Sequence, residues 1–191
     1  MLEDQKMISA LIRLMMPIFQ EGFFIESRLG ANVKDILCSE LGVTPEFVDC
    51  RIATVFIDGK AVDNIETARL SDGCILTLSG AMPGLVGACM RKSGQYASLR
   101  SGISYTPPLE ESAEKRGLVK VKIFNTMIQE LGPKLLKQGV LVNKKQLGKL
   151  LDETSKLDTG RNATDQMIQV PINSELTKIC FTFNSSTCQA Q

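Results

Sequence analysis

Hydrophobic positions in the first part of the chain follow two spacings, one typical of a short helix and one typical of strands. The helical spacing lies between Asn32, a residue type suited to an N-cap, and Gly42, which can end a helix. The apolar residues that share one side of this helix are Val33, Ile36, Leu37 and Leu41. We therefore expect one helix here, with Asp35 in its first turn.

Four runs rich in β-branched and aromatic residues predict strands. They are Gly22–Arg28, Arg51–Ile57, Lys60–Val62 and Cys74–Ser79. The dipeptide Asp58-Gly59 supplies the two positive-φ residues of a tight type I′ hairpin between the second and third runs. A second dipeptide of this kind, Asp72-Gly73, turns the chain into the fourth run.

The segment before the first of these strands is ambiguous. Five of its apolar residues fit a helical stripe: Ile8, Leu11, Ile12, Met15 and Phe19. The same stretch also fits a first strand. The pattern by itself leaves both interpretations open.

Residues 80–116 lack a continuous pattern. Glycines stand at positions 80, 84, 87, 94 and 102, and the pair Pro107-Pro108 resists both helix and central strand. Charge also changes across this segment, because residues 1–79 contain seven Lys and Arg against twelve Asp and Glu, whereas residues 112–191 contain twelve against seven. We expect a first domain at 1–82, a connector at 83–116 and a small basic α+β domain at 117–191.

The last third of the chain predicts helices followed by a hairpin. We expect a strand or a helix start at 118–124, a helix over 125–131 separated by a Gly132-Pro133 break from 134–138, and a strand at 140–142. Asn143 is a suitable N-cap for a helix that reaches Glu153. Its apolar side contains Leu147, Leu150 and Leu151. A polar loop at 158–162 then precedes two strands, 167–171 and 176–183.

The element order of the first domain and several short motifs resemble the β-grasp sulfur carriers, the family of the small subunit of molybdopterin synthase and the thiazole-synthesis carrier (MoaD/ThiS). The motifs are Gly30–Leu37, Phe56–Val62, Leu70–Gly73 and Ile75–Leu78. The resemblance covers residues 7–82. It implies an α+β fold in which a β-grasp (ubiquitin-like) mixed sheet has one helix, followed by the small α+β C-terminal module. It also favours a strand in the ambiguous first segment.

The resemblance ends where carrier chemistry would take place. In the family, the carboxylate of a free C-terminal glycine is adenylated and converted to a thiocarboxylate. Here Gly80 and Gly84 are followed by more chain, and no Gly-Gly pair is present. One hypothesis is therefore a sulfur carrier activated by cleavage near Gly80 or Gly84. The preferred hypothesis is a non-catalytic β-grasp module that binds a protein partner, placed by analogy in molybdenum-cofactor or sulfur metabolism.

The segment 80–105 is the expected contact surface of such a module. Small residues in it permit close approach of another backbone, and methionine-rich surfaces adapt to partners. The apolar residues expected to bind the partner are Met82, Leu85, Val86, Met90, Tyr96 and Leu99. Packing of the same residues onto the sheet or the second domain is the alternative that stays open.

Composition argues against most enzyme classes. The chain has no histidine, so neither a Ser-His-Asp triad nor a Cys-His dyad can form, and its six cysteines contain no C-x-x-C pair. Cys89 lies beside Arg91 and Lys92 but lacks a base, so we interpret it as an idle thiol. Arg91 also stands where a phosphate loop would need its second glycine. We expect no catalytic residue, no metal and no cofactor.

A nucleic-acid interface is the remaining hypothesis. A net charge of +1 predicts no global attraction to nucleic acid or membrane, so a local patch would be needed. Lys144, Lys145 and Lys149 would face phosphates if the last domain resembled a winged helix-turn-helix. The scarcity of arginines there favours an ordinary solvated face instead. Because no apolar run reaches the ~20 residues of a spanning helix and the start is acidic, we expect a cytoplasmic protein.

Overall fold

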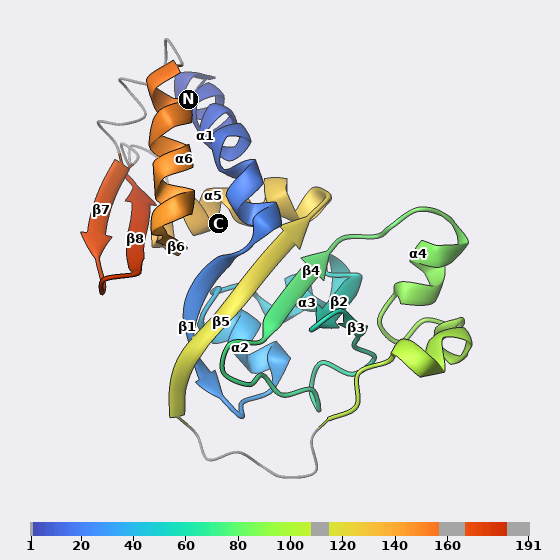
Figure 1. Ribbon diagram of the computed structural model, residues 1–191. Coiled ribbons are helices and arrows are strands. Elements are labelled where there is room, and N and C mark those ends of the chain that lie inside the picture. Colours follow the sequence, from blue (N-terminus) through green and yellow to red (C-terminus); the bar gives the residue numbers. More distant parts are fainter. Residues whose placement is uncertain (1, 108–114, 157–166, 183–191) are drawn as a thin grey trace. The chain divides into compact units, whose positions relative to one another are not determined.

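The computed structural model describes residues 2–107, 115–156 and 167–182 (Figure 1). Contacts divide the chain into two compact units. We call residues 19–130 the sheet unit, and residues 1–18 together with 131–191 the terminal unit. Helices and strands occur in both, so the α+β class expected from the sequence is confirmed.

The sheet unit is built on a mixed sheet. Its described strands are β1 (Phe23–Leu29), β2 (Thr54–Ile57), β3 (Lys60–Ala61), β4 (Ile75–Ser79) and β5 (Lys115–Phe124). Their order across the sheet is β3-β2-β4-β5-β1. β4 and β5 are parallel, with Leu76 opposite Val121, whereas the other neighbours are antiparallel.

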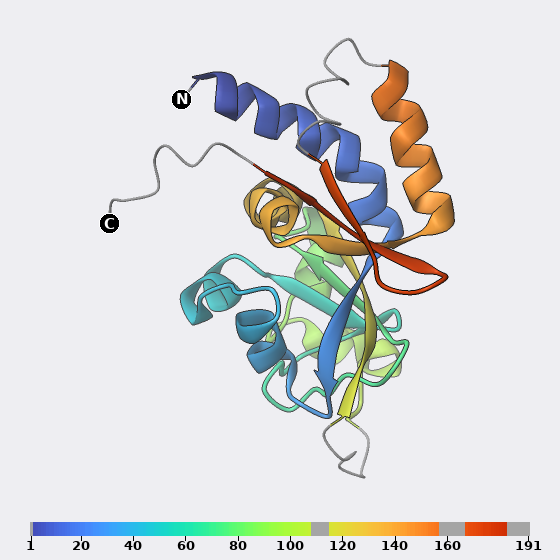
Figure 2. The same ribbon diagram turned by 90° about the vertical axis from the view of Figure 1, so that its left-hand side faces the viewer.

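One side of this sheet packs against two helices, α2 (Val33–Ser39) and α3 (Pro45–Cys50), which Figure 2 shows together in pale blue and cyan. The strand residues that point to this side are fully buried: Val55, Leu76, Leu78, Val119 and Val121.

Both helices begin at a capping residue. The Asn32 side chain accepts a hydrogen bond from the amide of Asp35 at 2.8 Å, at the start of α2. The Thr44 hydroxyl accepts one from the amide of Phe47 at 3.2 Å.

The predicted helix start and the positions of the strands are confirmed, but the helix ends at Ser39, short of the predicted end at Gly42, and α3 was not predicted. The helix begins after Asn32, and strands occupy parts of all four predicted runs. Asp58 (φ +49°) and Gly59 (φ +78°) form the tight turn between β2 and β3, as a type I′ hairpin requires. The Asp58 carboxylate also accepts a hydrogen bond from the amide of Ile75 at 2.8 Å, which joins this turn to β4.

The first segment is a helix, α1 (Leu2–Glu21), and the strand that the family resemblance favoured there is wrong. The helical stripe decides the outcome, because residues on one side of α1 are buried: Leu11, Ile12, Met15, Ile18 and Phe19. None of the described helices, α1 included, combines the length and the apolar character needed to cross a membrane.

Strand β5 belongs to the sheet unit, although composition groups its residues with the C-terminal part of the chain. It pairs with β4 on one side and with β1 on the other. The compact units therefore have other bounds than the expected divisions near residues 82 and 116. Composition and charge report on stretches of sequence, whereas the units follow contacts between segments that are far apart in sequence.

The terminal unit contains the first part of α1 and the last elements of the chain. These are the end of α5 (Thr126–Gln138), β6 (Val140–Asn143), α6 (Lys144–Lys156), β7 (Met167–Pro171) and β8 (Leu176–Phe181). The strands are antiparallel in the order β6-β8-β7. Asn143 caps α6 reciprocally: its Oδ1 accepts from the Gln146 amide at 2.9 Å, and Gln146 Oε1 accepts from the Asn143 amide at 3.2 Å. The loop expected at 158–162 lies outside the described residues.

The break expected at Gly132-Pro133 is also wrong, because α5 continues through both residues. A proline inside a helix removes one backbone hydrogen bond. Leu131, Leu135 and Leu136 are buried on either side of it. Burial of this apolar face favours one continuous helix over two short ones.

We predict that Phe19→Ala destabilises the sheet unit by about 3–5 kcal/mol, the usual cost of removing a buried aromatic ring. Phe19 and Phe23 are both fully buried, and their rings meet edge to face with centroids 5.8 Å apart. Chemical denaturation measures the loss. Gln20→Ala, at the exposed neighbouring position, should change the free energy of unfolding by less than about 0.5 kcal/mol. Equal effects of the two substitutions would contradict the burial of Phe19.

Candidate functional site

The connector joins the parallel strands β4 and β5. The chain must return along the sheet between such strands, which a tight turn cannot achieve. The described part of the return contains α4 (Gly84–Met90) and a 3-10 helix, η1 (Ala97–Ile103). It lies beyond β3 (Figure 1), where Ser104 bridges to Ala61 and the Tyr105 amide donates to the Ala61 carbonyl at 2.8 Å. The connector therefore covers the edge of the sheet.

A buried guanidinium, that of Arg100, holds the connector in place. The Arg100 side chain is 2% exposed, and its Nη2 lies 2.6 Å from Asp63 Oδ1 in an ion pair. Nε donates to the carbonyl of Cys89 at 2.5 Å, and Nη1 donates to the Ser104 hydroxyl at 3.0 Å. One side chain thus ties the end of α4, the end of η1 and the loop after β3 to one another.

Lys92 provides a second attachment. Its Nζ donates to the carbonyl of Val48 in α3 at 2.5 Å, and its amide donates to the carbonyl of Ala53 at 2.9 Å. Burial lowers the pKa of the Lys92 ammonium, because desolvation disfavours the charged form. The next residue, Ser93, donates from its hydroxyl to the Asp63 carbonyl at 3.1 Å. The turn that comes after α4 is therefore fixed from two sides.

Although Arg100 and Lys92 attach the connector to the sheet unit, several of its apolar side chains are exposed to solvent. Of the six residues predicted to bind a partner, Met82 and Met90 are half-buried. The other four are exposed, and the structure adds Ile103, which the sequence analysis missed although it follows Leu99 at helical spacing. We call these five residues the connector surface, and they are between 47% and 71% exposed: Leu85, Val86, Tyr96, Leu99 and Ile103.

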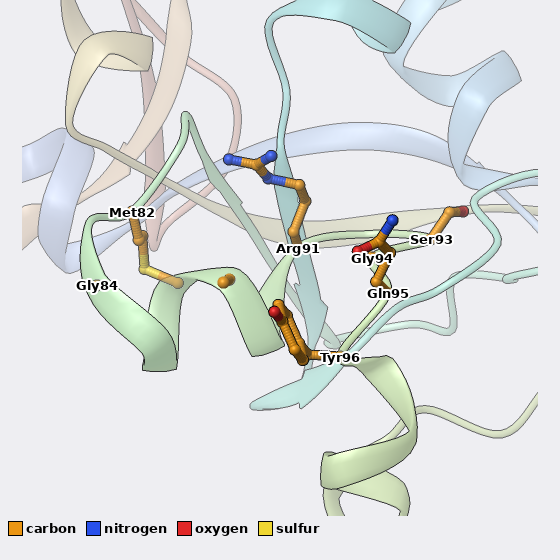
Figure 3. A pocket seen from close by; sticks show the side chains of 8 residues that line it. Met82, Gly84, Arg91, Ser93, Gly94, Gln95 and Tyr96 are labelled. Atoms are coloured by element: carbon orange, nitrogen blue, oxygen red, sulfur yellow. The ribbon is translucent and has the colours of Figure 1, made fainter.

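A pocket of about 490 Å³ lies beside this surface (Figure 3). Its volume is within the range of ~300–1,000 Å³ that is typical of ligand sites. Figure 3 shows Arg91 and Tyr96 on one side of the hollow and Met82 across from them. The sequence analysis noted Arg91 as a neighbour of Cys89 and as the residue that interrupts a phosphate loop, and did not assign it to a binding site. The lining residues are Met82, Gly84, Ala88, Arg91, Ser93, Gly94, Gln95 and Tyr96.

Two backbone features shape this pocket. Gly87 is buried against the Met82 carbonyl, so a side chain at position 87 would collide with backbone. Ser93 has a positive φ of +52°, uncommon for a residue other than glycine, and the Gly94 amide donates to the Arg91 carbonyl at 3.2 Å. The pocket wall is therefore a constrained turn that holds the backbone of Arg91 in one place.

The two glycines considered as processing sites lie in different surroundings. Gly80 is buried at the end of β4, and a side chain there would collide with the hydroxyl of Thr126. Gly84 starts α4 with φ +78° and has open space around its Cα. A carrier tail needs a freely extending end, and the backbone at Gly80 is instead packed within the sheet unit.

Lys144, Lys145 and Lys149 are exposed on α6, as the sequence analysis expected. The buried side of this helix consists of Gln146, Leu150 and Thr154, while Leu151 is 37% exposed rather than packed. Exposed lysines opposite a buried face are what a solvated helix requires.

The thiol of Cys89 is half-buried at the end of α4. Its backbone carbonyl accepts from Arg100, while the Lys92 ammonium is directed to Val48. Within the described ranges, no group of three or more Cys, Asp or Glu residues could hold a metal ion. The site therefore offers apolar side chains, one exposed guanidinium and a pocket.

We predict that Arg100→Met releases the connector and destabilises the sheet unit by about 1–3 kcal/mol. The range lies below the cost of breaking a fully buried pair, because the Asp63 side chain is 43% exposed. Hydrogen exchange should accelerate at the amides of residues 91–105 and stay unchanged in β1. Arg91→Met removes the same charge from an exposed position of the connector. It should leave hydrogen exchange unaltered both at residues 91–105 and in β1. Unchanged exchange in the Arg100 variant would contradict the anchoring role.

We also predict that Gly87→Ala reshapes the pocket, since the added methyl group meets the Met82 carbonyl. Overpacking of this kind costs about 1–3 kcal/mol. Gly102→Ala is the matched control, because a Cβ at Gly102 has nothing within 4 Å. Two-dimensional NMR should show shifts around residues 82–96 in the first variant only. Similar spectra for both variants would show that α4 does not pack as described.

Comparison of the chain with protein-family models, with curated proteins and with solved structures finds no match. Function therefore has to be inferred from the geometry of the described residues. The connector surface and its pocket are the features on which that inference rests.

Proposed function

We propose that this protein is a non-catalytic interaction module that binds a protein partner through the connector surface. The observation that carries the proposal is the exposure of five large apolar side chains on a segment whose backbone is pinned by Arg100 and Lys92. A fixed segment cannot fold back to bury these side chains. A partner can cover them without first ordering the backbone, which lowers the entropic cost of binding.

The distribution of exposed side chains supports this choice of surface. Single exposed apolar residues are ordinary in soluble proteins. In the described part of the sheet unit, however, the exposed large hydrophobic residues all belong to the connector. Clustering on one segment is typical of a contact surface, whereas scatter is typical of a solvated one.

We further propose that the sheet unit is a β-grasp domain in which one strand has moved from the start of the sequence to its end. In a β-grasp fold, the strand expected before β1 would form an antiparallel hairpin with β1. β5 occupies that kind of position, because it is antiparallel to β1 while following all other strands of the unit in sequence. Rearrangements of chain order that keep the spatial arrangement are tolerated when the joined ends lie at the surface.

The position of β5 also supports binding over carrier chemistry. In a sulfur carrier the last strand of the motif ends in a free tail, whereas here β4 continues through the buried Gly80 into the connector and on to β5. Cleavage near Gly80 would break the covalent link between β4 and β5, one of its two paired neighbours. The geometry therefore favours binding over carrier chemistry. By analogy with the family, the partner belongs to molybdenum-cofactor or sulfur metabolism.

The proposal predicts that the double variant Leu85→Asp and Leu99→Asp loses a specific partner. Proteins captured by the tagged full-length chain from a native extract would be identified, and the strongest candidate purified and titrated against wild type and variant. Two charges in an apolar contact should weaken binding at least about a hundredfold. Ile168→Asp with Val170→Asp, two exposed apolar positions of β7, is the matched control and should bind normally. Equal affinity of wild type and the connector variant would reject the connector surface as the docking site.

A further inference from the structure

Each polar side chain that lines the pocket can donate hydrogen bonds, and among them the Ser93 hydroxyl already donates to the Asp63 carbonyl. Arg91, Gln95 and Tyr96 present a guanidinium, an amide and a phenol, each of which can donate hydrogen bonds. Within the part of the chain that the structure describes, the pocket lining contains no carboxylate. A donor-rich wall without an acidic partner is complementary to an anion.

Arg91 stands apart from the other connector cations in its surroundings. The Arg100 guanidinium is buried on Asp63, and the Lys92 ammonium is directed to the Val48 carbonyl. Arg91 is exposed, and among the described residues its side chain has neither a hydrogen bond nor an ion pair. Its backbone is nevertheless fixed, because its carbonyl accepts from Gly94 at 3.2 Å and from Arg100 at 3.4 Å. A free guanidinium on a fixed backbone is arranged for an external acceptor.

We infer that the pocket binds a carboxylate side chain of the partner, held by Arg91 and oriented by Gln95 and Tyr96. This inference rests on the proposed function, since the carboxylate belongs to the segment that docks on the connector surface. Met82 and Ala88 line the same pocket and would pack against the methylene groups of the acidic side chain. Leu85 and Leu99 are exposed and would contact the apolar neighbours of the acid. The docking segment is therefore an acidic residue flanked by apolar ones.

A carboxylate fits this pocket better than a phosphate. Phosphate sites gather several cations or a row of backbone amides. Here one guanidinium is available, because Lys92 points elsewhere and α4 is too short to serve as an anion site. One guanidinium matches one carboxylate in charge and in its paired donor geometry.

The test uses the full-length protein and two capped peptides, Ac-Leu-Asp-Leu-Leu-NH2 and its analogue with Asn in place of Asp, titrated by NMR. The Asp peptide should bind about tenfold more tightly than the Asn peptide, with shifts at the Arg91 and Gln95 side-chain N–H groups. The Arg91→Gln variant should bind the Asp peptide only as tightly as it binds the Asn peptide. Lys145→Gln, which removes an exposed charge from α6, should leave the tenfold difference unchanged.

Several outcomes would overturn the inference. Equal binding of the two peptides, an unchanged preference in Arg91→Gln, or no shift at the pocket at concentrations of tens of millimolar would each do so. Inorganic phosphate that binds the same groups more tightly than the Asp peptide would assign the pocket to a phosphorylated ligand instead. If Arg91→Gln binds the purified partner normally while the Leu85→Asp and Leu99→Asp variant does not, the carboxylate site fails and the proposed function stands.

Discussion

The parallel pairing of β4 with β5 is the constraint on which the arrangement of the sheet unit depends. Parallel neighbours cannot be joined by a hairpin, so the chain has to leave the end of β4 and return to the start of β5 from the other end of the sheet. The connector exists because of this requirement. β5 also pairs with β1, so it lies between β4 and β1 in the sheet.

A long return would cost conformational entropy and expose the edge at β3 unless it were attached. Arg100 attaches the return to the edge of the sheet, because its donors reach Cys89, Ser104 and Asp63 at the same time. Desolvating a guanidinium is expensive, and only this full set of acceptors offsets the cost. The attachment also shapes the candidate site, since Leu85 and Leu99 on the attached segment are exposed and a pocket lies beside Arg91.

The sequence located the candidate site better than it described it. Residues 80–105 stood out because they lack periodicity, and four of the six apolar residues named there are exposed. The separate roles of Arg91, Lys92 and Arg100 could not be predicted from the sequence, because all three are basic residues in a segment without periodicity. Burial separates them: Arg100 is an anchor, Lys92 is turned to α3, and Arg91 is left for solvent or a ligand.

Local chemistry alone determined the cap at Asn32, the turn at Asp58-Gly59 and the reciprocal cap at Asn143, because each depends on hydrogen bonds and sterics within a few residues. Tertiary packing decided the rest. The first segment became α1 and α5 ran through Pro133 since burial of an apolar face outweighed the competing local signals. The neighbours of β5 depended on residues far away in sequence, and no local pattern encodes which distant strands will meet.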